Sequence, residues 1–231
     1  MRVLTWNLFH GRAVPGAGCD LETEFAATLA GWDWDVALLQ EVPPWWPASL
    51  ARTCDAQQRT VLTSRNALLP LRRLVARRAP DLIKSNGGGA NAILVRGRAG
   101  TIGTIVAHRS VVLRRRPERR VCHAVELSGG AWVANLHAQV HSEQHAQADI
   151  ANAAAATLAW AGDAPALLGG DLNVRAPGAP QFTSLGGHGV DHILGRGFSA
   201  VGTSELPARG RLSDHAAVIA CIVAHAGDTG G

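Results

Sequence analysis

The fold is best inferred from the stretch Ala164-Pro165-Ala166-Leu167-Leu168-Gly169-Gly170-Asp171-Leu172-Asn173. Its first half is a short apolar run bounded by proline and glycine, which predicts a buried strand. The two glycines allow the backbone to turn tightly where the strand ends. Asp171 and Asn173 are two residues apart, so in extended geometry their side chains lie on one face. A carboxylate beside a carboxamide suits orientation of a water molecule, because the carboxylate can accept its proton.

Taken alone, the string Gly169-Gly170-Asp171-Leu172-Asn173 is also ordinary turn composition, and a surface turn is the alternative. The ends of the other predicted strands bear on this choice. Residues 35–41 form a continuous apolar run, typical of a strand buried on both faces, and the run ends in a carboxylate. In all, six segments bring polar side chains to the ends or edges of apolar strands, which predicts that they converge on one cleft. These side chains are Asn7, Glu41, Asn135 with His137, Asp171 with Asn173, Asp191, and Asp214 with His215.

The composition indicates a soluble globular protein, since 47% of the 231 residues are hydrophobic and 17% are charged. No apolar run reaches the roughly 18 residues that a membrane span needs, and the N-terminus lacks the apolar core of a signal peptide. We therefore expect a cytoplasmic protein with one domain over residues 1–224 and a disordered tail over residues 225–231. The four cysteines are widely scattered, so neither a zinc site nor a disulfide is expected.

The positive charge is carried almost entirely by arginine, because Lys84 is the only lysine among 22 basic residues. Arginine binds phosphate oxygens in a bidentate way that lysine cannot, although genomic base composition would produce the same bias. One predicted β-hairpin concentrates arginine at its tip. Such a tip could contact a nucleic-acid backbone, and an exposed charged turn is equally consistent with it. The hairpin arginines are Arg114, Arg115, Arg116, Arg119 and Arg120.

Two further segments contain apolar side chains that are expected to pack within the domain. Residues 66–78 have helical spacing, which predicts Leu68, Leu71 and Val75 on the inward face and arginines in solvent. The pair Trp45-Trp46 could stack on bases, but packing against the domain surface is the favoured interpretation.

The ordered set of strand ends resembles the endonuclease/exonuclease/phosphatase superfamily. This superfamily includes pancreatic-type deoxyribonucleases, apurinic endonucleases, neutral sphingomyelinases and inositol-polyphosphate phosphatases. The final triplet of the set is a weak match by itself, whereas the ordered set is specific and spans residues 5 to 215. The matching strings are Thr5-Trp6-Asn7, Leu38-Leu39-Gln40-Glu41, Asn135-Leu136-His137, Gly169-Gly170-Asp171-Leu172-Asn173, Val190-Asp191-His192-Ile193-Leu194 and Ser213-Asp214-His215.

The resemblance implies an α/β (α+β) fold, a four-layer α/β sandwich. Two mainly antiparallel β-sheets would pack face to face with helices outside, and the site would lie at one end of the sandwich. A doubly wound parallel sheet fits less well, because several neighbouring strands leave no room for a crossover helix.

The resemblance also implies a divalent metal ion, magnesium or manganese. Glu41, helped by Asn7, resembles the metal-binding pair of the superfamily. Asp214 would lie near a metal. Carboxylate and amide oxygens are the ligands that such hard cations prefer, which agrees with this assignment.

The catalytic roles follow from the same resemblance. Asp171 would activate or position the attacking water, with Asn173 beside it holding the phosphate or the carboxylate. His137 and His215 would donate hydrogen bonds to the phosphate as negative charge develops on its oxygens. The chain contains no tyrosine, so superfamily nucleases with tyrosine at the site are poor guides, and His137 fits the branch with histidine there.

Strand geometry predicts the partner of His215. Asp214 and His215 are adjacent in sequence, so in an extended chain their side chains point to opposite faces. Asp191 arrives on a different strand. We therefore predict an Asp191–His215 pair, in which the carboxylate fixes the tautomer and stabilises the imidazolium.

These features lead to the expectation of a monomeric magnesium-dependent phosphodiester hydrolase that acts on nucleic acid, DNA or RNA. A phosphatase or a lipid or inositol phosphodiesterase is the second interpretation, and a catalytically inactive binding module is the third. Retention of Glu41, Asp171 and His215 argues against an inactive module. The side chains expected to contact phosphate or substrate are Asn7, Asn135, Arg119 and Arg120.

Overall fold

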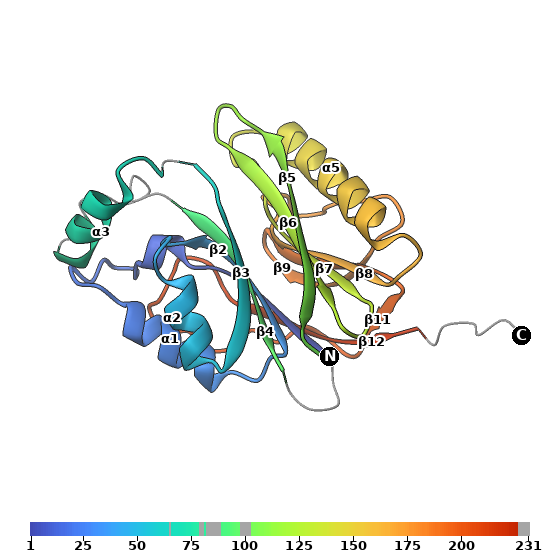
Figure 1. Cartoon of the computed structure of the whole chain (residues 1–231), viewed down its shortest axis with the longest axis horizontal. Coiled ribbons are helices and arrows are strands. Elements are labelled where there is room, and N and C mark those ends of the chain that lie inside the picture. The colour runs from blue at the N-terminus through green and yellow to red at the C-terminus, as the bar shows by residue number, and fades with distance from the viewer. Residues whose placement is uncertain (65, 79–80, 82–88, 98–102, 226–231) are drawn as a thin grey trace, which may run out of the picture.

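The computed structural model describes residues 1–64, 66–78, 81, 89–97 and 103–225. Within this part of the chain, two six-stranded sheets pack face to face (Figure 1). The strands of the first sheet, in spatial order, are β11 (Phe198–Ala200), β12 (Val218–Ala224), β1 (Arg2–Asn7), β2 (Val36–Val42), β4 (Ala90–Arg96) and β3 (Ala56–Leu62). Those of the second are β5 (Ile105–Arg114), β6 (Arg120–Leu127), β7 (Trp132–His137), β8 (Ala166–Asp171), β10 (Asp191–Arg196) and β9 (Thr183–His188).

Both sheets are mixed but mainly antiparallel. In the first sheet β1 and β2 run parallel, and in the second β7 and β8 do, whereas the other paired strands are antiparallel. Parallel neighbours end at the same edge of a sheet, so each sheet brings two strand ends together. The register places Asn7 beside Gln40 in one sheet and His137 beside Asp171 in the other. This arrangement confirms the predicted four-layer sandwich.

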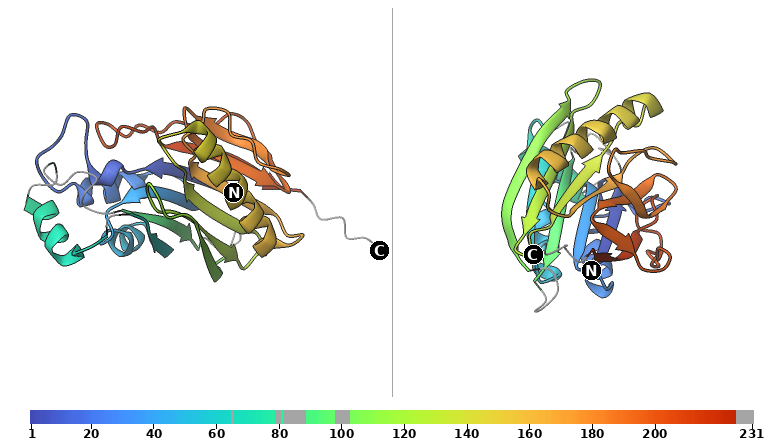
Figure 2. Two further views of the ribbon diagram at one scale, coloured as in Figure 1. Left: turned by 90° about the horizontal axis from the view of Figure 1, so that it is seen from above. Right: turned by 90° about the vertical axis from the view of Figure 1, so that its right-hand side faces the viewer.

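Helices cover the outer faces of the two sheets (Figure 1 and Figure 2). Apolar side chains fill three layers: outside the first sheet, between the sheets, and outside the second sheet. In the outer layer of the second sheet, Ala146, Ala153 and Ala154 let the longest helix lie close to the strands. The helical segments are η1 (Phe9–Gly11), α1 (Glu22–Gly31), α2 (Pro47–Thr53), α3 (Leu69–Arg78) and α5 (Glu143–Ala161).

The structure tests both predictions about apolar side chains. Trp46 is 3% exposed, and its ring centroid lies 5.4 Å from that of Phe25, which confirms that it packs within the protein. The inward face predicted for residues 66–78 is wrong. No residue of α3 is buried, and Leu68 and Leu71 are 72% and 57% exposed. Periodicity describes a face of a helix but does not specify that another element covers it.

The C-terminal segment was expected to be disordered from residue 225. His225 is held, however, since its backbone N–H donates to Gly197 O at 2.9 Å and its Nε2 lies 2.8 Å from Ser199 Oγ. Residues 226–231 of the predicted tail lie outside the described residues. No helix in the described ranges is long and apolar enough to cross a membrane.

Candidate active site

The two pairs of parallel strands end at an opening of about 410 Å³ between the sheets. Asn7 and Glu41 reach it from β1 and β2 of the first sheet, and His137 and Asp171 from β7 and β8 of the second. Most of the predicted site residues line this opening. They are Asn7, Glu41, Arg119, Arg120, His137, Asp171, Asn173, Asp214 and His215.

Asp171 lies at the centre of the polar contacts and is 2% exposed. One carboxylate oxygen, Oδ2, accepts a hydrogen bond from Asn7 Nδ2 at 2.9 Å, and Oδ1 accepts one from the backbone N–H of Asn173 at 3.1 Å. Burial, followed by the negative charge of Asp191, raises the pKa of Asp171, although His215 and Asn7 oppose the rise. A buried carboxylate with a raised pKa is a stronger base than a solvated one, which suits proton abstraction.

The glycines before Asp171 permit the tight path of β8. Gly170 has φ +140°, and a Cβ built there would lie 1.8 Å from the carbonyl oxygen of Leu136. Asn173 also has a positive φ, 52°, and its Nδ2 donates to Ala138 O at 3.0 Å. Asn173 therefore fixes the strand end and the loop after β7, and its N–H orients the Asp171 carboxylate.

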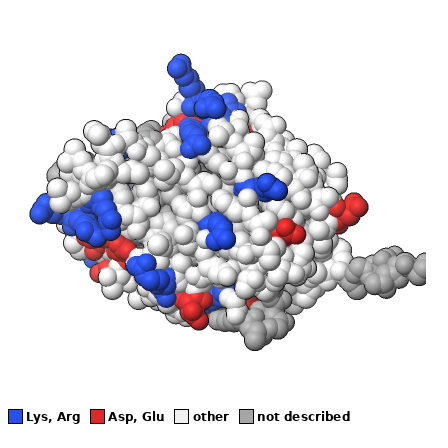
Figure 3. Space-filling view, in the orientation of Figure 1, with Lys and Arg blue, Asp and Glu red and all other residues white. Residues whose placement is uncertain are grey.

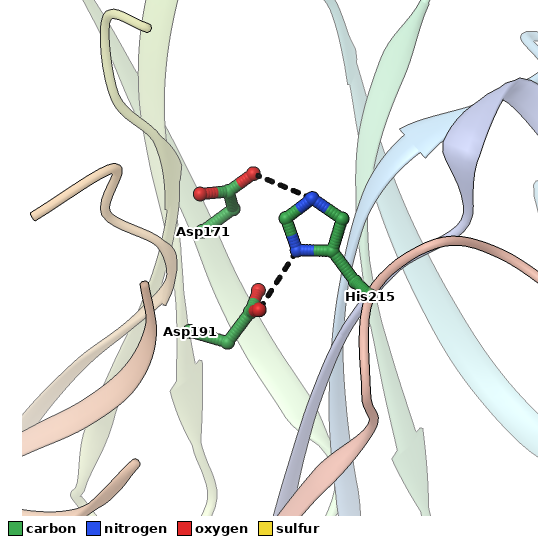
Figure 4. Close-up of side chains that lie close together, drawn as sticks. All are labelled: Asp171, Asp191 and His215. Carbon is green, nitrogen blue, oxygen red and sulfur yellow. Dashed lines mark hydrogen bonds and ion pairs between the residues drawn. The ribbon is translucent and has the colours of Figure 1, made fainter. Parts of the chain in front are cut away.

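His215 lies between two carboxylates (Figure 4). Its Nδ1 donates to Asp191 Oδ2 at 2.8 Å, and its Nε2 lies 3.8 Å from Asp171 Oδ2. Burial disfavours the imidazolium, but the hydrogen bond and charge of Asp191 outweigh it and raise the pKa of His215 to about 9. His215 is therefore protonated at neutral pH. The predicted Asp191–His215 pair is present, whereas Asp214 is exposed at the rim of the opening.

Glu41 enters the opening because β2 is irregular at its end. The register against β4 shifts between Leu39 and Val42, and Glu41 has φ 49°, so the strand bulges and re-aims this side chain. Its Oε2 lies 3.0 Å from His10 Nε2, and Oε1 lies 4.0 Å from His137 Nδ1. Burial alone would raise the pKa of Glu41, but the hydrogen bond and charge of His10, together with the charge of His215, lower it overall. Glu41 is therefore ionised and partly open to the cavity.

His137 behaves differently from His215. Burial, reinforced by the charge of Arg120, lowers the pKa of His137 to about 3. The imidazole is therefore neutral and can donate only one N–H. Its Nε2 lies 3.5 Å from Asp171 Oδ2.

The donor chemistry of the opening fits a hard divalent cation. Glu41 contributes an ionised carboxylate, and Asn7 contributes an amide whose Oδ1 accepts the N–H of Phe9 at 2.9 Å. Asp214 supplies a further carboxylate at the rim, and no cysteine is among the described residues that line the opening. Oxygen donors without thiolates suit magnesium or manganese better than zinc. A second possible ligand set has its atoms within 4.8 Å of one another and consists of Asp171, Asp191 and His215.

Asn135 does not reach the opening, although it shares a strand face with His137. It is fully buried, and its Nδ2 donates to Leu39 O and Ala92 O, both at 3.0 Å. Its Oδ1 accepts a hydrogen bond from Gln40 Nε2 at 2.8 Å. Asn135 thus ties the two sheets together below the site. The expected contact of Asn135 with phosphate is therefore wrong.

The hairpin arginines separate into two groups. Arg120 is 4% exposed, pairs with Glu118 at 2.6 Å and lines the opening, and Arg119 donates from Nη1 to Leu62 O. Arg114 pairs with the buried Asp149 of α5 at 3.1 Å. The five arginines therefore do not form one exposed charged turn, which was one of the two alternatives for this hairpin. Only Arg115 and Arg116 of the five are exposed, and basic side chains are visible at the top of Figure 3, above the β5–β6 hairpin.

Sequence reasoning missed His10, Phe9 and Arg12, which also line the opening. They follow Asn7 in the turn that includes η1, where Phe9 and His10 have φ values of 50° and 54°. Their position directly after Asn7 in the sequence was the available clue. The alternating pattern of a strand does not extend to them, because β1 ends at Asn7.

The sequence profile of the Endonuclease/Exonuclease/phosphatase family matches residues 4–215. No curated protein sequence gives a significant match. Three solved structures illustrate the similarity in fold. An endonuclease/exonuclease/phosphatase from Beutenbergia cavernae DSM 12333 is 19% identical, with a TM-score of 0.66 over 97% of this chain and 72% of that one.

The mannosyl-6-phosphatase Bt3783 from Bacteroides thetaiotaomicron VPI-5482 is 15% identical, with a TM-score of 0.70 over 96% of this chain and 99% of that one. TDP2 from Caenorhabditis elegans is 18% identical, with a TM-score of 0.63 over 95% of this chain and 73% of that one. At these identities the likeness concerns the fold.

Proposed function

The chain belongs to the Endonuclease/Exonuclease/phosphatase family, and from this premise we propose that it is a magnesium-dependent phosphodiester hydrolase acting on nucleic acid. One observation carries the proposal. A buried carboxylate, Asp171, faces a protonated histidine, His215, at an opening that also contains the ionised Glu41. A base, a proton-bearing group and a hard oxygen ligand are the components that metal-assisted phosphoester hydrolysis requires.

Glu41 and Asn7 are the proposed metal ligands, with Asp214 near the ion. The bound ion would polarise a phosphoryl oxygen as a Lewis acid. His10 holds the Glu41 carboxylate in place through the 3.0 Å contact.

Asp171 is the proposed base. It accepts a proton from water while the water oxygen forms a bond to phosphorus and the ester oxygen leaves. Asn7 and the Asn173 N–H hold the carboxylate in one orientation. His215 donates its Nε2–H to the phosphate, and Asp191 keeps Nδ1 protonated. His137, being neutral, adds a single N–H donor.

Arginine placement supports a nucleic-acid substrate. Arg119 and Arg120 line the opening, and Arg115 and Arg116 are exposed on the same hairpin, where they can contact a phosphate backbone. Support for a lipid substrate is weaker than the sequence allowed, because Trp46 is buried. Leucine side chains on α3 are nevertheless exposed, so the substrate panel includes a lipid, sphingomyelin.

A phosphatase acting on a small phosphomonoester is the second candidate. A cavity of about 410 Å³ matches the size of pockets that hold single small molecules, roughly 300–1,000 Å³. One similar structure is named a mannosyl-6-phosphatase. The same reaction centre would serve either substrate.

A substrate panel tests the proposal. The panel comprises plasmid DNA, RNA, an abasic duplex, sphingomyelin vesicles, inositol phosphates and mannose 6-phosphate, each with magnesium, manganese, zinc or EDTA. We expect magnesium-dependent cleavage of nucleic acid that is lost in EDTA and in Asp171→Asn, but retained in Asp163→Asn, an exposed aspartate used as the matched control. Turnover of the monoesters alone would support the phosphatase, and turnover of none would leave a binding module.

A further inference from the structure

The turn that follows β1 presents three side chains to the opening, and their arrangement is unusual. Phe9 and His10 occupy the left-handed region, and Gly11 and Arg12 donate backbone hydrogen bonds to Leu8 O and Phe9 O at 2.8 and 3.1 Å. Such strained backbone is maintained at functional sites when surrounding contacts fix it. Phe9, His10 and Arg12 all line the opening.

Arg12 lines the opening and stacks on an aromatic ring instead of pairing with a carboxylate of the described residues. Its guanidinium Cζ lies 3.7 Å from the centre of the Phe9 ring, so the two planes can stack. Its Nε is buried without a hydrogen-bond partner, and no side-chain ion pair of Arg12 occurs among the described residues. Arg120, by contrast, is paired with Glu118. The Arg12 side chain is only half-buried and lines the opening, so an anionic ligand bound there would accept hydrogen bonds from its guanidinium.

The topology places Arg12 across the reaction centre from the other arginines. Arg12 O accepts the N–H of Ser213, and Ser213 Oγ accepts the N–H of His215, at 2.9 and 3.0 Å. The Arg12 turn is therefore tied to the loop that precedes β12. Arg120 begins β6, and Arg119 precedes it. Strand β6 contacts β3 at one side of the sandwich, whereas β12 contacts β9 and β10 at the other side.

We propose that Arg12, stacked on Phe9, forms a subsite for a second anionic group of the substrate, next to the phosphate that is cleaved. This inference rests on the proposed phosphodiesterase function and narrows its substrate class. The preferred substrate is a strand with at least two consecutive phosphates, so that one phosphate occupies the reaction centre while its neighbour accepts hydrogen bonds from Arg12. A substrate with one phosphate leaves the Arg12 fork unpaired.

Short thymidine substrates test the subsite. The kinetic comparison uses TpT, which has one phosphate, with pTpT and TpTp, which add a terminal phosphate at one end or the other. We expect at least one of the longer substrates to exceed TpT in kcat/KM by roughly tenfold, the scale of a charge-assisted contact. Arg12→Gln should reduce this ratio toward one, and Arg12→Lys should give an intermediate ratio because it keeps charge without the fork. Arg52→Gln, at an exposed site on α2, should keep the wild-type ratio.

The outcomes separate this subsite from the function on which it rests. Equal kcat/KM for all three substrates in the wild type, or an unchanged ratio in a folded Arg12→Gln variant, overturns the subsite and leaves the phosphodiesterase intact. Failure to hydrolyse any of them counts against the proposed function. In that event calorimetry still decides the subsite. Tighter binding of pTpT or TpTp than of TpT, lost on Arg12→Gln, supports it, and equal binding overturns it.

Discussion

His215 Nδ1 lies 2.8 Å from Asp191 Oδ2, so a carboxylate at the start of β10 in one sheet holds a histidine that precedes β12 in the other (Figure 4). The contact joins the two halves of the sandwich at the opening. It also explains why His215 stays charged despite partial burial, since the Asp191 charge favours the imidazolium. The first prediction follows from this pair.

Asp191→Asn should lower turnover by roughly 10²-fold, the scale expected when one positioned, charged donor is weakened. His215 has a pKa of about 9 and acts when protonated, so it defines an alkaline limb where activity falls. Without the Asp191 charge its pKa drops, and this limb should move to lower pH. The Asp191 charge also raises the pKa of Asp171, so the acidic limb should move to lower pH as well.

The pH–rate profile of Asp214→Asn is the matched control for that experiment. Asp214 is exposed and lies next to His215 in sequence, so its charge should have the smaller effect. A stationary alkaline limb in Asp191→Asn together with a shifted one in Asp214→Asn would reverse the assignment of the orienting carboxylate.

Glu41→Gln should weaken magnesium binding by at least about tenfold while the protein remains folded, because a neutral amide replaces the ionised ligand. Titration calorimetry with magnesium measures the change, and Glu24→Gln, an exposed substitution on α1, provides the control. Unchanged affinity in Glu41→Gln would remove Glu41 from the metal site. If Asp171→Asn abolished binding instead, the ion would belong to the cluster of Asp171, Asp191 and His215.

Arg115→Gln with Arg116→Gln should flatten the salt dependence of DNA binding. Each phosphate contact contributes about 0.7–0.9 to the slope of log K against log salt, so the slope should fall by about 1.5. Hydrolysis of a small chromogenic phosphodiester should not change, because both arginines lie outside the opening. Arg52→Gln with Arg59→Gln removes the same charge from another exposed region. An identical slope in the hairpin variant and the wild type would show that Arg115 and Arg116 are solvated side chains that do not contact DNA phosphates.

Gly170→Ala should destabilise the protein by roughly 3–5 kcal/mol, within the range of severe single substitutions. The added Cβ would lie 1.8 Å from the carbonyl oxygen of Leu136, and neither backbone can yield without moving Asp171. Gly162→Ala is the matched control, since its φ is also positive, +57°, but nothing lies within 4 Å of the added Cβ. It should cost about 1–2 kcal/mol. Urea unfolding measures the free energy of unfolding of both variants. Equal losses of stability would show that backbone strain at positive φ, and not the clash with Leu136, causes the destabilisation.

Much of the framework was accessible from sequence because it depends on local patterns. Apolar runs ending in polar residues marked the strands that reach the site, and the resemblance of their ordered set to the endonuclease/exonuclease/phosphatase superfamily implied a two-sheet sandwich. The predicted pairing of His215 with Asp191 is present, but its premise of an extended strand is not, because Asp214 and His215 lie in a bend before β12.

Other features depended on how the elements pack. Asn135 and His137 share one face of β7, yet Asn135 is sealed between the sheets and His137 reaches the opening, because they lie at different depths. Arg120 pairs with Glu118 beside the site, although its sequence context resembles an exposed turn.

The sequence by itself determined which residue types stand at the strand ends, because side-chain alternation and turn composition are local properties of the chain. The tertiary structure decided which of them meet. Asn7 and Asp171 are 164 positions apart, and they share a hydrogen bond only because two separately formed sheets pack face to face. The parallel pairing of β1 with β2 within the first sheet likewise brings His10 to Glu41, and Leu71 on α3 is exposed. The burial of a side chain and the residues that it contacts depend on packing between distant segments, which no local periodicity encodes.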